Sequence, residues 1–156
     1  MQTLLKSLRT WDVEAAKRPD IYIANSHEVA GRIKKYYERD SVILWPPVET
    51  HRFTAGVIPV STRKYYVMTT ALTPFKRVDI AVRVLSKFGK NLKIIGTGDQ
   101  EAELRKLAGP TIEFLGRIED AEVAKIYQAA RGFLMPQKED AGIAPIEAMA
   151  SGVPVF

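Results

Sequence analysis

The sequence predicts an α/β fold built on a parallel, doubly wound sheet. From residue 65 onward, short segments rich in β-branched and aromatic residues alternate with amphipathic segments of helical period. Strands that alternate with helices in this way form βαβ units, in which each helix crosses back over the sheet. Successive strands therefore run parallel, with helices on both faces of the sheet.

Residues 2–17 form a predicted amphipathic helix, because leucine, tryptophan and alanine side chains recur on one face at helical spacing. Such a helix packs on a protein core or lies on a membrane surface. Packing on a core is the commoner case, and Asp12 and Glu14 dilute the basic character that a membrane-binding face requires. We therefore expect protein packing, with membrane contact through Trp11 as the alternative.

The following segment predicts a strand, a helix and an extended stretch. Residues 21–25 are apolar and predict a short buried strand, and Ser26 is a good N-cap for a helix that ends near Asp40. Residues 42–48 are expected to be extended, since each proline restricts the residue before it. Residues 51–64 have the composition of a linker loop.

The elements from residue 65 onward make up one predicted domain. Its strands are residues 65–72, 92–98, 112–116 and 132–136, and its helices are residues 77–88, 99–108, 119–130 and 144–150. Residues 152–156 are an apparent fifth strand with no covering helix after it, so one face of this strand is expected to be exposed or covered by polypeptide outside this sequence. The chain thus divides into residues 1–50, the linker and a domain over 65–156 that looks incomplete at its C-terminus.

Composition excludes several classes of function. The chain has no cysteine and only two isolated histidines, so neither disulfides nor a protein-built metal site is expected. No apolar run approaches the roughly 20 residues that span a bilayer, and the N-terminus lacks the apolar core of a signal peptide. We expect a cytoplasmic protein, either soluble or peripheral on the inner face of the membrane. The formal charge of +5 suits a phosphate-bearing ligand or an anionic surface and decides little between them.

Ligands of parallel sheets bind beyond the carboxyl ends of the strands. Four segments meet this condition: residues 71–77, 96–99, 116–119 and 137–147. In the last of them, Gly142 and Pro145 predict a turn and then a helix from about Ala144, so the amides of residues 142 to 144 are left for an anion. Glu139 precedes this helix and Glu147 lies in its predicted first turn. A sugar diphosphate suits such a site.

Each candidate also has a purely structural explanation. Glu147 can complement the helix dipole, with Gly142 as an ordinary turn glycine. A solvated surface position or a tight turn accounts for each of the others: Lys76, Arg77, Gly96, Gly98 and Arg117. A retaining glycosidase needs its two carboxyl groups about 5 Å apart, a geometry that eight positions across a turn do not supply in any obvious way. The arrival of all the candidates at one sheet edge favours a binding site.

Several passages together resemble the retaining glycosyltransferases of family 4, which have the GT-B fold: VILWPPVETHRF after ANS, FKRVDIAV, IIGTGDQEAEL, IEFLGRIEDAEV and EDAGIAPIEAMASGVPV. The mannosyltransferases that build lipopolysaccharide O-antigen are the most similar subgroup. The resemblance covers nearly the whole chain and implies two facing Rossmann-like domains, one for acceptor and one for donor. Residues 1–50 would correspond to the end of the acceptor domain and 65–156 to most of the donor domain, with the main acceptor domain outside this sequence.

The resemblance implies a role for each matching position. Glu147 would hold the ribose hydroxyls, and Glu139 would lie near the hydroxyls of the donor sugar. Lys76 would bind the diphosphate and stabilise it as it leaves, so Lys76 and Glu139 are the expected catalytic residues. The other donor-binding positions would be Arg77, Gly96, Gly98, Arg117, Ile118, Gly142, Ile143 and Ala144.

One position departs from the family pattern. Thr70 and Ala71 stand where the family has Gly or Ser followed by an arginine that shares the diphosphate charge with the lysine. Losing a charge-assisted contact of this kind costs about 2 to 3 kcal/mol of leaving-group stabilisation unless Arg77 or another cation substitutes. We therefore expect the isolated chain to bind nucleotide weakly and to transfer nothing measurable.

The sequence thus predicts the donor-binding part of a retaining glycosyltransferase, with GDP-mannose as the first expected donor and a UDP-sugar as the second. No cofactor, metal or nucleic acid is expected, and the acceptor would be a polysaccharide or a lipid-linked glycan. The alternative is a non-catalytic nucleotide-sugar-binding or assembly module that pairs its open sheet edge with a partner chain or a second copy. An epimerase of the same architecture is a third possibility, but its His-containing donor loops have no counterpart here.

Overall fold

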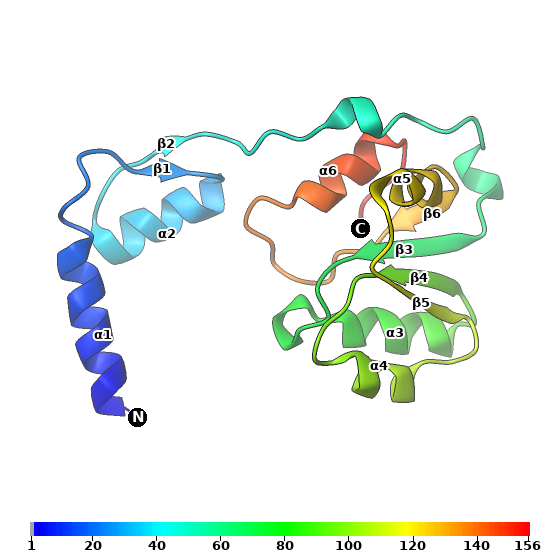
Figure 1. The fold of residues 1–156 in the computed structure, drawn as a ribbon, viewed down its shortest axis with the longest axis horizontal. Helices are drawn as coiled ribbons and strands as arrows, with labels where there is room; N and C mark the ends of the chain where they lie inside the picture. Colours follow the sequence, from blue (N-terminus) through cyan, green and yellow to red (C-terminus); the bar gives the residue numbers. More distant parts are fainter. Residues whose placement is uncertain (1) are drawn as a thin grey trace. The chain divides into compact units, whose positions relative to one another are not determined.

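The computed structural model describes residues 2–156, which separate into two compact units. The first ends at Pro47 and the second comprises Val48–Phe156. Each unit is described by itself (Figure 1). None of the helices in the described part of the chain is both long and apolar enough to cross a membrane.

The first unit holds two helices and a two-stranded parallel sheet: α1 (Gln2–Ala15), β1 (Ile23–Ala24), α2 (His27–Tyr37) and β2 (Val42–Ile43). Ser26 caps α2 as predicted, because its hydroxyl oxygen accepts a hydrogen bond from the backbone N–H of Val29 at 3.1 Å. The helix ends at Tyr37, slightly earlier than predicted, because Glu38 adopts a left-handed conformation with φ 56°.

Two apolar faces of this unit are less buried than the sequence predicts. Ala24 is fully buried, but Ile23, its neighbour in the short strand, is 63% exposed, because α2 contacts the sheet and the face that carries Ile23 has no such cover. On α1, Leu4, Leu8 and Trp11 are all more than half exposed. The predicted packing of this stripe on a protein core is therefore absent from the described residues.

The second unit is a parallel α/β layer structure. Its strands are β3 (Tyr65–Thr69), β4 (Asn91–Ile95), β5 (Ile112–Gly116) and β6 (Ala130–Phe133), and its helices are α3 (Val78–Lys87), α4 (Glu101–Leu107), α5 (Asp120–Gln128) and α6 (Ile143–Ala150), with the 3₁₀ turns η1 (Thr50–Arg52), η2 (Val60–Thr62) and η3 (Pro74–Lys76). All strand pairs are parallel, in the order β5-β4-β3-β6. A parallel bridge from Phe133 to Val155 adds the C-terminal segment beside β6, where a fifth strand is predicted. The predicted α/β class is confirmed.

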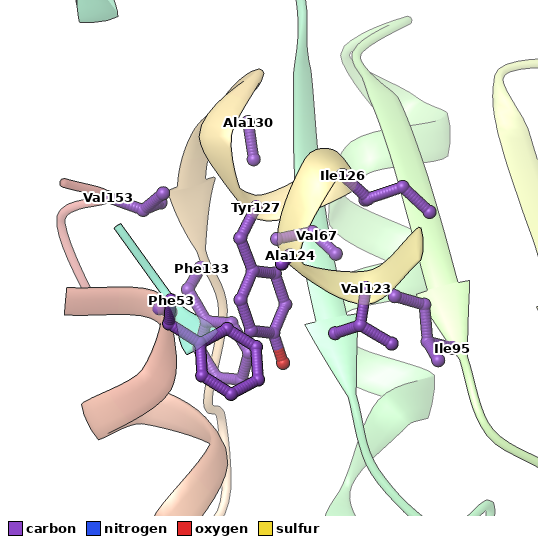
Figure 2. Close-up of a cluster of buried hydrophobic side chains, with 11 residues drawn as sticks. Phe53, Val67, Ile95, Val123, Ala124, Ile126, Tyr127, Ala130, Phe133 and Val153 are labelled. Atoms are coloured by element: carbon purple, nitrogen blue, oxygen red, sulfur yellow. The ribbon is translucent and has the colours of Figure 1, made fainter. Parts of the chain in front are cut away.

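Helices cover both faces of this sheet (Figure 1). One core cluster lies under α3 and α4 and contains Met68, Val82 and Leu92. The other lies under α5 and α6, and in it the Tyr127 ring packs between Phe53 and Phe133, with ring centroids 5.9 Å and 5.8 Å away (Figure 2). The strands are therefore buried on both faces, as expected of a doubly wound sheet.

Residues 51–64, predicted as a linker loop, pack on the second unit. Phe53 is 5% exposed and belongs to the core beneath α5 and α6. Arg63 is also 5% exposed, and its guanidinium donates to the carbonyl oxygens of Ile58 at 2.9 Å and of Ala130 and Gly152 at 3.0 Å each. The composition of the segment does not reveal these contacts because both depend on residues more than 60 positions away in sequence.

The chain segments that leave β3 and β4 stay in close contact beyond the strands. Thr70 donates its backbone N–H to the carbonyl of Ile95, and Leu72 donates to Thr97, both at 3.0 Å. Gly96 has φ +123°, and a Cβ on it would lie 2.0 Å from the carbonyl oxygen of Thr70. A side chain cannot fit there, so this glycine is required by the approach of two backbones.

We expect Gly96→Ala to destabilise the second unit by about 3 kcal/mol or more, because it adds a steric clash to an unfavourable backbone conformation. Gly116→Ala is the matched control, since Gly116 lies at the same sheet edge with φ +67° but a Cβ there meets nothing within 4 Å. The control should cost only about 1 kcal/mol. Urea unfolding of both variants measures the difference, and equal losses would contradict the assigned contact.

Candidate functional site

The predicted site residues lie on the loops that follow β3, β4, β5 and β6 and on helix α6. Because these strands are parallel, their carboxyl ends meet at one edge of the sheet. Lys76 ends the 3₁₀ turn after β3, Arg117 and Ile118 follow β5, and Glu139 lies in the loop between β6 and α6.

Lys76 and Glu139 form an ion pair that joins the loop after β3 to the loop after β6. Lys76 Nζ lies 2.5 Å from Glu139 Oε2, and the two side chains are only 18% and 25% exposed. Gln137 donates its side-chain N–H to the same carboxylate oxygen at 3.0 Å. The structure therefore brings the two residues predicted to be catalytic into direct contact.

The ion pair sets the charge state of Glu139. The Lys76 hydrogen bond lowers the pKa of the Glu139 carboxyl most, the Gln137 hydrogen bond lowers it further, and partial burial opposes both. Glu139 is therefore held as a carboxylate that can only accept hydrogen bonds. A phosphate group that binds Lys76 must compete with this carboxylate.

Helix α6 offers its N-terminus to the same loop. Gly142 is its N-cap with φ 55°, and a Cβ there would lie 2.8 Å from Pro145 Cγ and 3.3 Å from Glu139 Cγ. No side chain caps the helix, and the amides of Ile143 and Ala144 lie in its first turn, where they have no intrahelical acceptor. Lys76 is held at this loop by its ion pair with Glu139. The cation and the free amides make this end of the site suited to an anion.

Glu147 lies on α6, which begins one residue earlier than predicted. The helix begins at Ile143, which places Glu147 in its second turn, and left-handed Gly142 permits this earlier start. Burial raises the pKa of the Glu147 carboxyl, the charge of Asp120 raises it further, and Arg52 opposes both. Among the described residues, no group donates a hydrogen bond to this carboxylate, so it remains open to the hydroxyls of a ligand.

Other predicted residues have different surroundings. The Arg77 guanidinium pairs with Asp79 at 3.2 Å. Ala71 is exposed and Arg117 is exposed, whereas Ile118 packs partly on the core. Gly96 and Gly98 lie against the backbones of Thr70 and Leu72, where a Cβ would not fit. A tight turn therefore accounts for both glycines.

Sequence reasoning did not single out two residues of this edge. Gln137 lies within the candidate segment of residues 137–147, and its position two residues before Glu139 is the signal in the sequence that points to it. Arg52 lies in the segment taken as a linker, and its guanidinium reaches Asp120, 68 positions away in sequence. Within residues 2–156, no group of three or more His, Cys, Asp or Glu side chains is placed to hold a metal ion.

The ion pair predicts how stability responds to acid. Because the folded-state pKa of Glu139 is lowered from the ordinary value of 4.5, the pair contributes stability that is fully present above that value and is lost as pH falls through the folded value. Lys76→Met should cost about 2 kcal/mol near pH 7 and should flatten the fall in stability below pH 4.5.

Urea unfolding between pH 7 and pH 3 measures this dependence. Lys106→Met is the control, because its partner Glu103 and Lys106 are both 69% exposed and their pair should contribute little. A wild-type slope that Lys76→Met leaves unchanged would show that the Lys76 to Glu139 contact does not form in solution.

Comparison with known proteins identifies a family and two similar mannosyltransferases. Residues 63–156 match the family described as "Glycosyl transferases group 1". A phosphatidyl-myo-inositol mannosyltransferase of Mycobacterium leprae is 42% identical over 69 residues, which are 41% of this chain and 18% of that protein. A GDP-mannose-dependent monoacylated alpha-(1-6)-phosphatidylinositol monomannoside mannosyltransferase of Corynebacterium glutamicum is 39% identical over 76 residues, which are 42% of this chain and 20% of that protein.

Solved structures show the same fold at low identity. HepE of Anabaena, determined in complex with UDP and glucose, superposes with a TM-score of 0.78 at 17% identity and covers 94% of this chain and 47% of its own. The two mannosyltransferases are much longer than the matched segments, and this chain spans about one fifth of their length. The predicted resemblance to family 4 glycosyltransferases with the GT-B fold is confirmed. Since the family match covers more than half of its residues, the chain belongs to the glycosyl transferases group 1 family.

Proposed function

We propose that this chain carries the donor-binding half of an enzyme that transfers a sugar from a nucleoside diphosphate sugar to a glycan or lipid-linked acceptor. The observation that carries the proposal is the arrangement of Lys76, the N-terminus of α6 and Glu147 along one sheet edge. A cation and free amides suit a diphosphate, and an open carboxylate suits the ribose hydroxyls.

The donor would lie along this edge in a defined order. Lys76 and the amides of Ile143 and Ala144 neutralise the diphosphate as its bond to the sugar breaks, which is where electrostatic stabilisation contributes most. Glu139, freed from Lys76, accepts hydrogen bonds from the donor sugar. Glu147 accepts from the ribose, and the main chain at Ile118 contacts the base.

GDP-mannose is the donor we favour. The relative from Corynebacterium glutamicum is named as GDP-mannose-dependent, and the relative from Mycobacterium leprae is named as a mannosyltransferase. A UDP-sugar is the second choice, because the structure of HepE holds UDP and glucose. Retention of configuration and transfer without a metal belong to the same proposal. A cytoplasmic location, with peripheral contact to the membrane where a lipid-linked acceptor resides, also belongs to it.

A non-catalytic binding module is the second candidate, and Ala71 favours it. The site has Lys76 as its diphosphate cation, and Lys76 is engaged by Glu139, so charge stabilisation of a leaving diphosphate is weaker than the family pattern implies. Such a module would bind a nucleotide sugar, or would pair with a partner chain or a second copy, without transferring the sugar.

Glu147→Gln should weaken the binding of GDP or UDP about 10- to 30-fold and leave the binding of inorganic pyrophosphate unchanged, since a neutral amide has one acceptor oxygen in place of two and accepts more weakly from ribose hydroxyls. Lys76→Met should weaken nucleotide and pyrophosphate alike. Calorimetric titration with inorganic pyrophosphate and with four nucleotide ligands, GDP, UDP, GDP-mannose and UDP-glucose, tests both variants. Equal binding of all four ligands by wild type and Glu147→Gln would overturn the assigned nucleoside end.

Ala71→Arg should tighten nucleoside diphosphate binding about 30- to 100-fold, because a second cation at the carboxyl end of β3 shares the diphosphate charge. Ala71→Gln is the matched control, since it adds comparable length without charge and should change little. Titration of both variants with GDP at low and high salt is the measurement. The same affinity for the arginine and glutamine variants would place the diphosphate away from position 71.

A further inference from the structure

Arg52 connects η1 to α5, beside the helix α6 that carries Glu147. It ends η1, which contacts α6, and the next residue, Phe53, is buried in the core. Arg52 Nη1 donates to Glu49 Oε2 at 2.8 Å, and Nη2 donates to Asp120 Oδ2 at 2.7 Å. The guanidinium thus lies between the carboxylates of Glu49 and Asp120 and makes one charge-assisted bond to each.

Asp120 is the first residue of α5 and follows the Arg117 to Ile118 segment after β5. Helix α5 packs against α6, the helix of Glu147. The bond from Arg52 to Asp120 therefore joins the segment before β3 to the start of α5, on the side of the site assigned to the nucleoside. The Arg52 side chain is 43% exposed, so the bond by itself adds little to folding stability.

Charge balance gives the contact a second consequence. The charged and titratable groups on the elements packed against α6 are His51 and Arg52 from η1, and Asp120 and Tyr127 together with the more distant Glu122 and Lys125 from α5. Burial raises the pKa of the Glu147 carboxyl most, and of these charged groups Asp120 raises it further and Arg52 lowers it. Without Arg52, Glu147 would face the charge of Asp120 alone.

We propose that Arg52 is a positioning residue of the nucleoside subsite, which holds Asp120 in place and balances its charge so that Glu147 stays an ionised acceptor for the ribose hydroxyls. This inference rests on the proposed nucleotide-binding function, because it deepens the role of Glu147. Arg52 touches no part of the donor in this assignment, and it acts through its two neighbours.

The first test needs no ligand. The carboxyl carbon of Glu147 is titrated by NMR in wild type, Arg52→Gln, Arg52→Lys and the control Arg105→Gln, whose arginine pairs with Glu101 on α4. In Arg52→Gln the midpoint should rise by at least about 0.5 pH unit, because a cation that favours the charged form is lost. Arg52→Lys should restore most of the wild-type value, and Arg105→Gln should leave it unchanged.

The second test measures GDP affinity from pH 5 to pH 8. In Arg52→Gln the loss of affinity on acidification should begin at higher pH, and the affinity at pH 8 should return to within about threefold of wild type. A purely structural role would lower affinity at every pH. Wild-type binding with an unshifted Arg52→Gln profile would overturn this inference alone, whereas wild type that binds no nucleoside diphosphate would overturn the proposed function and this inference with it.

Discussion

The parallel pairing of β3 with β4 on one side and β6 on the other is the constraint on which the site depends. Thr69 pairs with Ile95, and Val67 pairs with Phe133, so the three strands end at one edge. Every candidate ligand group follows one of these strands or β5. The backbone contacts continue past the strands, where Gly96 lets the β4 turn touch Thr70. Because β3 pairs with β6, the loops that carry Lys76 and Glu139 are close enough to form an ion pair.

The site has two ends of opposite character. At one end, Lys76 and the free amides of α6 attract negative charge, and Glu139 forms an ion pair with the lysine. At the other end, Glu49 and Asp120 pair with the Arg52 guanidinium, and the charges of Asp120 and Arg52 act on the Glu147 carboxyl. A nucleoside diphosphate sugar has the matching distribution, with charge on its phosphates and hydroxyl donors on its two sugars. Charge pattern thus supports the direction in which we place the donor.

Local patterns in the sequence predicted much of the fold, because caps and strand periods depend on neighbouring residues. Ser26 caps its helix, and the strand predicted over residues 112–116 has the same bounds in the structure. The roles of Phe53 and Arg63 were not predictable, because each packs against residues far away in sequence. The site was predicted in part for the same reason. Glu139 and Lys76 stood out by position, but their ion pair and the bond from Arg52 to Asp120 arise only when distant loops meet.

The most direct test of the account is to follow the backbone amides of the ¹⁵N-labelled chain by NMR while GDP-mannose is added. The account predicts shift changes that concentrate at residues 71–77, 96–98, 117–120 and 139–147, at the carboxyl ends of the strands, with the amides of Ile143 and Ala144 moving most. Shift changes that concentrate at the opposite edge of the sheet, or none in a folded chain at millimolar ligand, would contradict the claim that this edge binds a nucleotide sugar.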